Sequence, residues 1–168
     1  MKILVTGGSG FLGSNLLLAL KKRNFDVVNF SRSIPSQLEN AVLEITKELF
    51  VISVSKFIET EPVDAPGQPK YFNGILIAHT EMKPLDLLHL LQRIEKMGGR
   101  ERSIQNAART IDLDLISYGE IFLDTAELTL PHPRAHLRAF VLEPWVSIDV
   151  DGVLPGHGEI KKLLAALH

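Results

Sequence analysis

The chain has no cysteine, no long apolar run and no excess of charge of one sign. Without cysteine there is no disulfide framework, no thiolate zinc site and no cysteine nucleophile. No segment reaches the roughly 18 consecutive apolar residues of a membrane span, and the amino terminus lacks the apolar stretch and cleavage site of a secretory signal. The net charge of -2 over 168 residues argues against a general nucleic-acid binder. We therefore expect one cytoplasmic, soluble domain.

Two aspartates, Asp112 and Asp114, alternate with aliphatic residues in the second half of the chain. Successive side chains of a strand point to opposite faces, so the two carboxylates share one face. Carboxylates about 6–7 Å apart can hold hard divalent cations, and magnesium fits best because it combines a few carboxylates with polyphosphate oxygens. The planar guanidinium of Arg109 can donate two parallel hydrogen bonds to a phosphate. An ordinary strand with a solvated face has the same pattern, so other segments must decide between a metal site and such a strand.

The amino-terminal segment has the pattern of a dinucleotide-binding unit. An apolar run over residues 2–6 precedes a G-x-x-G-x-x-G run over residues 7–13, a helical pattern and a second strand pattern over residues 26–30. Backbone amides at such a helix start can receive a diphosphate. Residues 1–33 thus resemble the opening of an extended short-chain dehydrogenase/reductase. The Tyr-x-x-x-Lys pair of those enzymes is absent, because Ile75 and Phe122 stand four places after Tyr71 and Tyr118.

Helical and strand patterns then alternate along the rest of the chain. Apolar spacing and turn residues predict a helix over residues 37–49, a strand over 50–58, a stiff loop with three prolines over 59–69, a strand over 75–79, and a helix from Lys83-Pro84 to Gly98-Gly99. A polar loop over residues 100–108 leads into the strand that carries the two aspartates.

Several blocks, in order, resemble the 6-hydroxymethyl-7,8-dihydropterin pyrophosphokinase family from about residue 38 to the carboxyl end. The blocks are Glu59-Thr60-Glu61-Pro62-Val63, Gln68-Pro69-x-Tyr71-Phe72-Asn73, Gly99-Arg100-x-Arg102, Ala108-Arg109-Thr110-Ile111-Asp112-Leu113-Asp114-Leu115, Tyr118-Gly119, Leu130-Pro131-His132-Pro133-Arg134-x-His136-x-Arg138-Ala139-Phe140-Val141-Leu142-x-Pro144 and Val153-Leu154-Pro155-Gly156-His157-Gly158. Blocks that match together are stronger evidence than any single motif.

The resemblance implies a kinase of folate biosynthesis that moves the β,γ-diphosphate of ATP to the pterin hydroxymethyl group and releases AMP. It implies that Asp112 and Asp114 hold two magnesium ions on the ATP phosphates. Arg100, Arg102 and Arg109 match basic residues around the polyphosphate, the first two on a loop that closes over the reactants. Closure of such a loop excludes water, which competes as an acceptor.

The resemblance also assigns the ligands of the two substrates by position. The implied ATP contacts are Glu95, Arg100, Arg109, His132 and Arg138, and the implied pterin contacts are Thr60, Glu61, Pro62, Val63, Tyr71, Asn73 and Phe140. An amide such as that of Asn73 offers both a donor and an acceptor to the pterin edge, and Phe140 can stack on the ring. Without the resemblance, Tyr71 and Phe140 are equally well explained as core aromatics.

The implied fold is α/β, a ferredoxin-like α/β sandwich with a mixed, mostly antiparallel sheet, preceded here by the Rossmann-like β-α-β segment. The family has a tryptophan before the arginine of the aspartate block, where this chain has Asn106. Leu12-Gly13-Ser14-Asn15 spells the family's first turn, but inside the glycine-rich run. Either the strand over residues 2–6 completes the sheet of a single domain over residues 1–168, or residues 1–33 mark a fusion to a truncated kinase.

Three functions stay open from the sequence. The first is the pyrophosphokinase, with ATP as co-substrate and two magnesium ions. The second is a fragment of an NAD(P)-binding oxidoreductase, and the third is a pterin- or nucleotide-binding module without turnover. All three have small molecules as partners rather than nucleic acid or a membrane, and the sequence leaves the oligomeric state undetermined.

Overall fold

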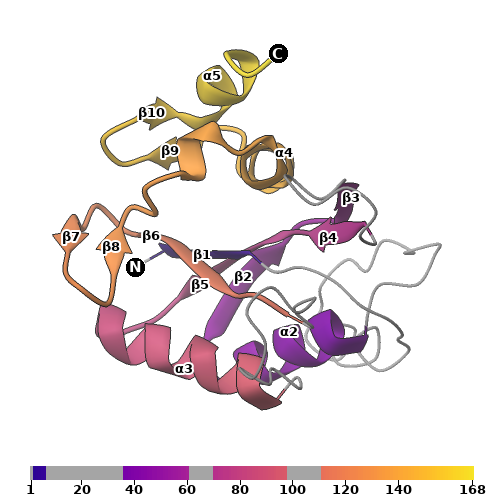
Figure 1. Cartoon of the computed structure of the whole chain (residues 1–168), viewed down its shortest axis with the longest axis vertical. Coiled ribbons are helices and arrows are strands. Elements are labelled where there is room, and N and C mark those ends of the chain that lie inside the picture. Colours follow the sequence, from indigo (N-terminus) through magenta and orange to yellow (C-terminus); the bar gives the residue numbers. More distant parts are fainter. Residues whose placement is uncertain (1, 7–35, 61–69, 98–110) are drawn as a thin grey trace.

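The computed structural model describes residues 2–6, 36–60, 70–97 and 111–168 (Figure 1). Their centre is a four-stranded sheet in the order β2-β5-β1-β6. The strands are β1 (Lys2–Thr6), β2 (Phe50–Val54), β5 (Ile75–His79) and β6 (Asp114–Tyr118). Each pair of neighbours in the sheet is antiparallel. The predicted strand over residues 75–79 is therefore confirmed, and the strand at the amino end lies in the interior of the sheet.

Two helices cover one face of this sheet (Figure 1). They are α2 (Ser36–Glu48) and α3 (Pro84–Met97), within a residue or two of the predicted bounds. Proline at the first position of α3 costs no hydrogen bond and fixes a helical φ. Both helices turn an apolar stripe to the sheet, where Leu38, Ile45, Leu91 and Ile94 are buried in one core cluster. The apolar spacing in the sequence thus identified both helices.

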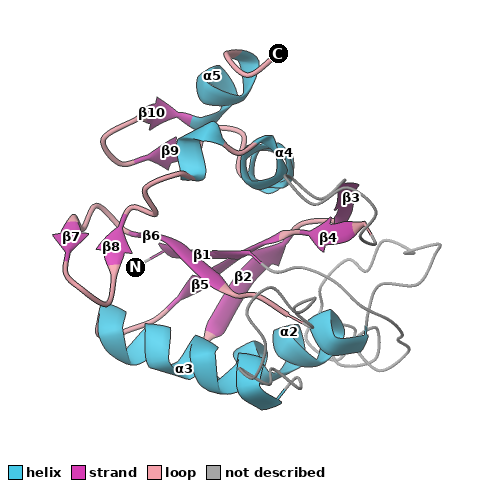
Figure 2. Ribbon diagram, viewed as in Figure 1, coloured by secondary structure: helices cyan, strands magenta, loops and turns pink. Residues whose placement is uncertain are grey.

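The carboxyl-terminal third of the chain covers the other face (Figure 2). It contains η1 (Ala135–Leu137), α4 (Ala139–Ile148), the hairpin of β9 (Val153–Leu154) and β10 (Gly158–Glu159), and α5 (Ile160–Ala165). Val141, Leu142 and Trp145 of α4 pack with Ile77 and Ile116 of the sheet in a second core cluster. Since each strand sends alternate side chains to opposite faces, one sheet supplies both cores.

Two small hairpins complete the described structure. They are β3 (Ile58–Thr60) with β4 (Tyr71–Asn73), and β7 (Leu123–Asp124) with β8 (Thr129–Leu130). The expected single strand over residues 50–58 is in fact divided between β2 and β3. The cause is Ser55, whose buried hydroxyl accepts the Ile75 N–H at 2.8 Å and donates to the Lys56 carbonyl at 2.9 Å. A side-chain oxygen that replaces a backbone carbonyl as the acceptor in a strand ladder interrupts the strand.

The expected Rossmann-like segment is described only at β1. That strand pairs antiparallel with both β5 and β6, whereas the first strand of a dinucleotide-binding unit runs parallel to its neighbours. The glycine-rich run and the second predicted strand lie outside the described residues. None of the described helices is long and apolar enough to cross a membrane.

The interior position of β1 can be tested with proline. Val5 pairs with Leu76 on one side and with Leu115 on the other, so a proline here removes a ladder donor inside the sheet. We expect Val5→Pro to lose at least about 1–3 kcal/mol of unfolding free energy, the cost of one unpaired buried carbonyl. Urea unfolding measures this loss. Val5→Ala keeps the N–H and is the control; equal stability of the two variants would contradict the pairing.

A pair of stacked histidines joins η1 to the β9–β10 hairpin. The ring centroids of His136 and His157 are 3.9 Å apart and the rings are 14° from parallel. Burial lowers the pKa of His157, and the neighbouring His136 lowers it further. The folded protein therefore resists protonation of this ring more than the unfolded chain does.

Acidification should accordingly weaken the fold. As the pH falls through the ordinary histidine pKa of 6.5, the unfolded chain binds more protons than the folded one, so stability decreases. We expect a lower urea midpoint at pH 5.5 than at pH 7.5, and a smaller decrease in His157→Gln. His168→Gln, at the carboxyl end, should keep the wild-type decrease. An unchanged pH dependence in His157→Gln would show that the stacked pair does not contribute.

Candidate active site

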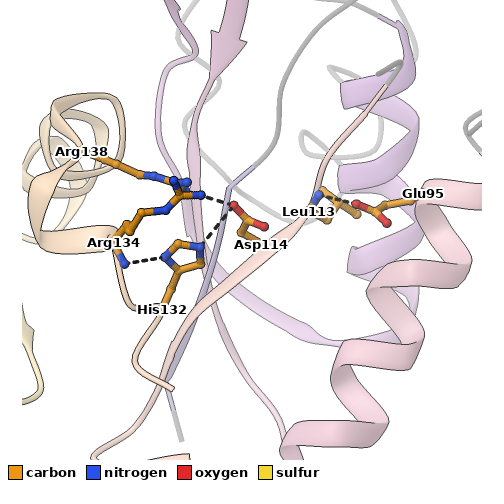
Figure 3. A network of polar contacts seen from close by, with 6 residues as sticks. All are labelled: Glu95, Leu113, Asp114, His132, Arg134 and Arg138. Atoms are coloured by element: carbon orange, nitrogen blue, oxygen red, sulfur yellow. Dashed lines mark hydrogen bonds and ion pairs between the residues drawn. The ribbon is translucent and has the colours of Figure 1, made fainter. Parts of the chain in front are cut away.

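Asp114, the first residue of β6, is the centre of a polar cluster on the sheet face that α4 covers (Figure 3). Its Oδ2 atom lies 3.4 Å from a terminal nitrogen of Arg138 and 3.9 Å from Nε2 of His132. The three side chains are 34%, 20% and 18% exposed, so solvent screens them only in part. The sequence resemblance had assigned all three to the metal and the nucleotide, and the fold brings them together.

The backbone around His132 fixes its ring. A cis peptide bond joins Leu130 to Pro131, and the His132 N–H then donates to the Ile116 carbonyl at 2.8 Å. The Arg134 N–H donates to Nδ1 of the ring at 3.2 Å. Because Nδ1 accepts, the neutral ring carries its proton on Nε2, the atom that faces Asp114.

The charge state of His132 follows from its surroundings. Burial lowers its pKa, Asp114 opposes that effect, and Arg138 and Arg134 add to it, with a net shift downward. A neutral imidazole is therefore favoured near pH 7, and at 3.9 Å its contact with Asp114 is too long for a hydrogen bond. Arg138 makes the closer approach to the carboxylate.

Arg138 and Phe140 extend the cluster to the start of α4. Arg138 is the N-cap residue of the helix, with extended backbone at φ -117° and ψ 101°. Its guanidinium carbon lies 5.4 Å from the centroid of the half-buried Phe140 ring, within range of a cation–π contact. The ring predicted to stack on a pterin is thus next to the arginine that approaches the carboxylate predicted to hold metal.

Burial alternates along the segment that leads into β6. Ile111, Leu113 and Leu115 are buried, while Asp112 and Asp114 are half-exposed. The aliphatic residues join the core beneath α2 and α3. Strand β6 begins only at Asp114, so Asp112 precedes the strand that was expected to carry both carboxylates. Both carboxylates are nevertheless more exposed than the aliphatic side chains between which they lie. Two half-exposed carboxylates suit Mg²⁺, which takes its other ligands from water and phosphate.

Glu95, which the resemblance assigned to the nucleotide, is buried on α3 at 3% exposure. Its Oε1 atom accepts the Leu113 N–H at 2.8 Å. In Figure 3 it lies across the chain from His132 and Arg138. The structure therefore brings Glu95 to the backbone between the two aspartates, from the side opposite Arg138 and His132.

The β3–β4 hairpin carries three of the described pterin candidates, Thr60, Tyr71 and Asn73. The Asn73 side chain donates through Nδ2 to the Thr60 hydroxyl at 2.7 Å, and Tyr71 pairs with Thr60 in the hairpin register. Helix α4 contacts both strands of the hairpin, so this hairpin adjoins the element that begins with Arg138 and Phe140. Glu61, Pro62 and Val63 lie outside the described residues.

Comparison with known proteins adds an independent observation. The model of the 7,8-dihydro-6-hydroxymethylpterin-pyrophosphokinase (HPPK) family matches residues 12–150. The chain belongs to this family. The 2-amino-4-hydroxy-6-hydroxymethyldihydropteridine pyrophosphokinase of Haemophilus influenzae is 35% identical over 153 residues, which cover 91% of this chain and 88% of the relative. The enzyme of the same name from Pseudomonas aeruginosa is 39% identical over 119 residues, 71% of this chain and 74% of the relative.

The HPPK match begins at residue 12, inside the glycine-rich run. It therefore includes the Leu12-Gly13-Ser14-Asn15 segment, which lies outside the described residues. No comparison supports the resemblance to a dehydrogenase/reductase. Three predicted phosphate ligands, Arg100, Arg102 and Arg109, fall within the HPPK match but outside the described residues.

Two features of the HPPK site were not predicted from sequence. The Arg134 backbone N–H orients the His132 ring, and the Leu113 N–H is held by Glu95. Every residue except proline has a backbone N–H, so the sequence does not show which of them donates to a side chain. One signal was available for Glu95, because it follows Leu87 and Leu91 at intervals of four on the buried face of α3. A carboxylate on an apolar stripe needs a buried partner.

Proposed function

We propose that this HPPK transfers the β,γ-diphosphate of ATP to 6-hydroxymethyl-7,8-dihydropterin and releases AMP. The observation that carries the proposal is the cluster of Asp114, His132 and Arg138, in a chain that matches the family over residues 12–150. In the transfer, the pterin hydroxyl oxygen forms a bond to the β-phosphorus. The bond between that phosphorus and the oxygen of the α-phosphate breaks, AMP leaves, and the hydroxyl proton is released.

We assign Asp112 and Asp114 to magnesium, as two ions shared with the ATP phosphates. Their half-exposed carboxylates are a suitable donor set. Bound magnesium would neutralise polyphosphate charge and favour loss of the hydroxyl proton. Arg138 and His132 lie beside Asp114, and we assign both to the nucleotide. Their role is to orient the phosphates, because positioning and charge stabilisation supply most of the catalysis in phosphoryl transfer.

We assign the pterin to the β3–β4 hairpin and the start of α4. Asn73 would read the pterin edge with its amide while its bond to Thr60 holds the side chain in place. Phe140 would stack on the ring, and Tyr71, Glu61, Pro62 and Val63 would complete the pocket. Arg100, Arg102 and Arg109 would contact the polyphosphate, the first two on a loop that closes and excludes water.

We further propose that residues 1–168 form a single ferredoxin-like domain of a cytoplasmic enzyme, with residues 1–33 as an atypical amino-terminal segment. Support comes from β1, which lies between β5 and β6. The described elements run β1-α2-β2-β5-α3-β6, apart from the β3–β4 hairpin. A β-α-β-β-α-β order is that of the ferredoxin-like fold.

The proposed reaction is tested by AMP formation from ATP and the pterin. We expect AMP only with magnesium and both substrates, and at least a hundredfold loss of kcat in Asp112→Asn and Asp114→Asn, because each loses a charged metal ligand. Asp151→Asn changes an aspartate that is 86% exposed in another part of the chain and is the matched control.

Two results would overturn this proposal. Magnesium-dependent ATP binding without AMP release would favour a binding module. Tight NADPH binding, lost in Gly10→Val, with no AMP release would favour the oxidoreductase fragment. If both aspartate variants still release AMP, the assignment of magnesium to Asp112 and Asp114 is wrong, while the proposed reaction stands.

The pterin assignment is tested at Asn73. Asn73→Asp keeps the shape of the side chain but replaces the amide donor by a carboxylate oxygen. We expect KM for the pterin to rise roughly tenfold or more, since an unsatisfied polar group costs about 1–3 kcal/mol, with KM for ATP unchanged. Steady-state kinetics measures both. Asn40→Asp, at an exposed position of α2, is the control; an equal rise in both KM values would contradict a specific pterin contact.

A further inference from the structure

The backbone between Asp112 and Asp114 is held by a buried carboxylate. Glu95 is 3% exposed, and its Oε1 atom accepts the Leu113 N–H at 2.8 Å (Figure 3). This N–H belongs to the peptide bond that joins Asp112 to Leu113. A buried carboxylate is costly unless it is paired or accepts hydrogen bonds. The bond therefore accounts for part of the interaction that keeps Glu95 inside the protein.

In the described part of the chain, Leu113 immediately precedes the first residue of β6. The described ladder between β1 and β6 ends at the pair of Thr6 and Asp114, one residue after Leu113. A buried backbone N–H beyond the end of a ladder needs another acceptor. The Glu95 carboxylate provides it, and so extends the fixed backbone to the peptide that carries Asp112.

The direction of the contact puts Glu95 on the side of the chain opposite Arg138 and His132. Glu95 is one of the buried residues of α3, the helix that packs in the core with Leu113. Asp114 points to the other face, where it meets Arg138 and His132. Glu95 thus approaches the aspartate pair from the core side.

We propose that Glu95 is a positioning residue that sets the spacing of Asp112 and Asp114 through the Leu113 amide, and that it acts on magnesium affinity rather than by contact with ATP. This inference rests on the proposed role of the two aspartates. A carboxylate pair with a fixed backbone loses less freedom when it binds a cation than a pair on a mobile segment.

Two variants separate the hydrogen bond from the packing. Glu95→Gln keeps an acceptor oxygen in a side chain of similar size, whereas Glu95→Met fills similar volume without an acceptor. We expect Glu95→Met to need roughly tenfold more magnesium for half-maximal AMP formation at saturating ATP and pterin, and Glu95→Gln to stay within about twofold of wild type. Glu39→Met removes a carboxylate that is 7% exposed on α2 and is the matched control.

Hydrogen exchange gives a second readout that needs neither metal nor turnover. In the metal-free protein, the Leu113 amide should exchange at least tenfold faster in Glu95→Met than in wild type, while Glu95→Gln and Glu39→Met keep its protection. Thermal unfolding of each variant identifies any general loss of structure.

Each possible outcome decides the inference. An unchanged magnesium requirement in Glu95→Met, with activity lost in Asp114→Asn, overturns the role of Glu95 and leaves the proposed function intact. A higher KM for ATP at saturating magnesium in Glu95→Met overturns it in favour of a direct nucleotide contact. If AMP formation does not depend on magnesium and Asp114→Asn is still active, the proposed metal-binding role of Asp112 and Asp114 is overturned, and with it the role of Glu95.

Discussion

The structure depends on the segment from Ile111 to Ile116. Its side chains contribute to both hydrophobic cores and to the polar cluster around Asp114. Leu113 and Leu115 join the core beneath α2 and α3, and Ile116 joins the core beneath α4. A shift of register by one residue would bury the carboxylates and expose the aliphatic side chains, at a cost of several kcal/mol. The apolar residues therefore fix where Asp112 and Asp114 can point.

His132 and Arg138 lie on the carboxyl-terminal segment, which is attached to β6. The N–H of His132 donates to the carbonyl of Ile116, two residues beyond Asp114. The chain then turns through η1 into α4, which begins with Arg138 as its cap and is anchored by Val141 and Leu142. Arg138 and His132 reach Asp114 because their segment is bonded to β6 through the His132 N–H and packs on the sheet face that Ile116 shares.

Periodic apolar positions made α2 and α3 predictable, because burial against a sheet repeats with the period of a helix. β5 is instead a short run of consecutive apolar residues, buried on both faces. The resemblance of blocks identified His132 and Arg138, which the structure brings to Asp114. Ser55 could not be foreseen as a break between β2 and β3, since its hydroxyl acts on a backbone group twenty residues away. The partner of Glu95 is likewise a backbone amide, and the interior place of β1 follows from pairings that no local pattern encodes.

Charge balance explains why the proposed site suits a metal nucleotide better than a metal alone. Asp114 already has the Arg138 guanidinium at 3.4 Å, so a lone divalent cation would approach a carboxylate whose charge is partly compensated. A polyphosphate brings several negative charges with the metal. Arg138 and His132 can then turn to phosphate oxygens, which releases Asp114 for the cation. On the proposed assignments, the pairing of Arg138 with Asp114 therefore couples metal binding to nucleotide binding.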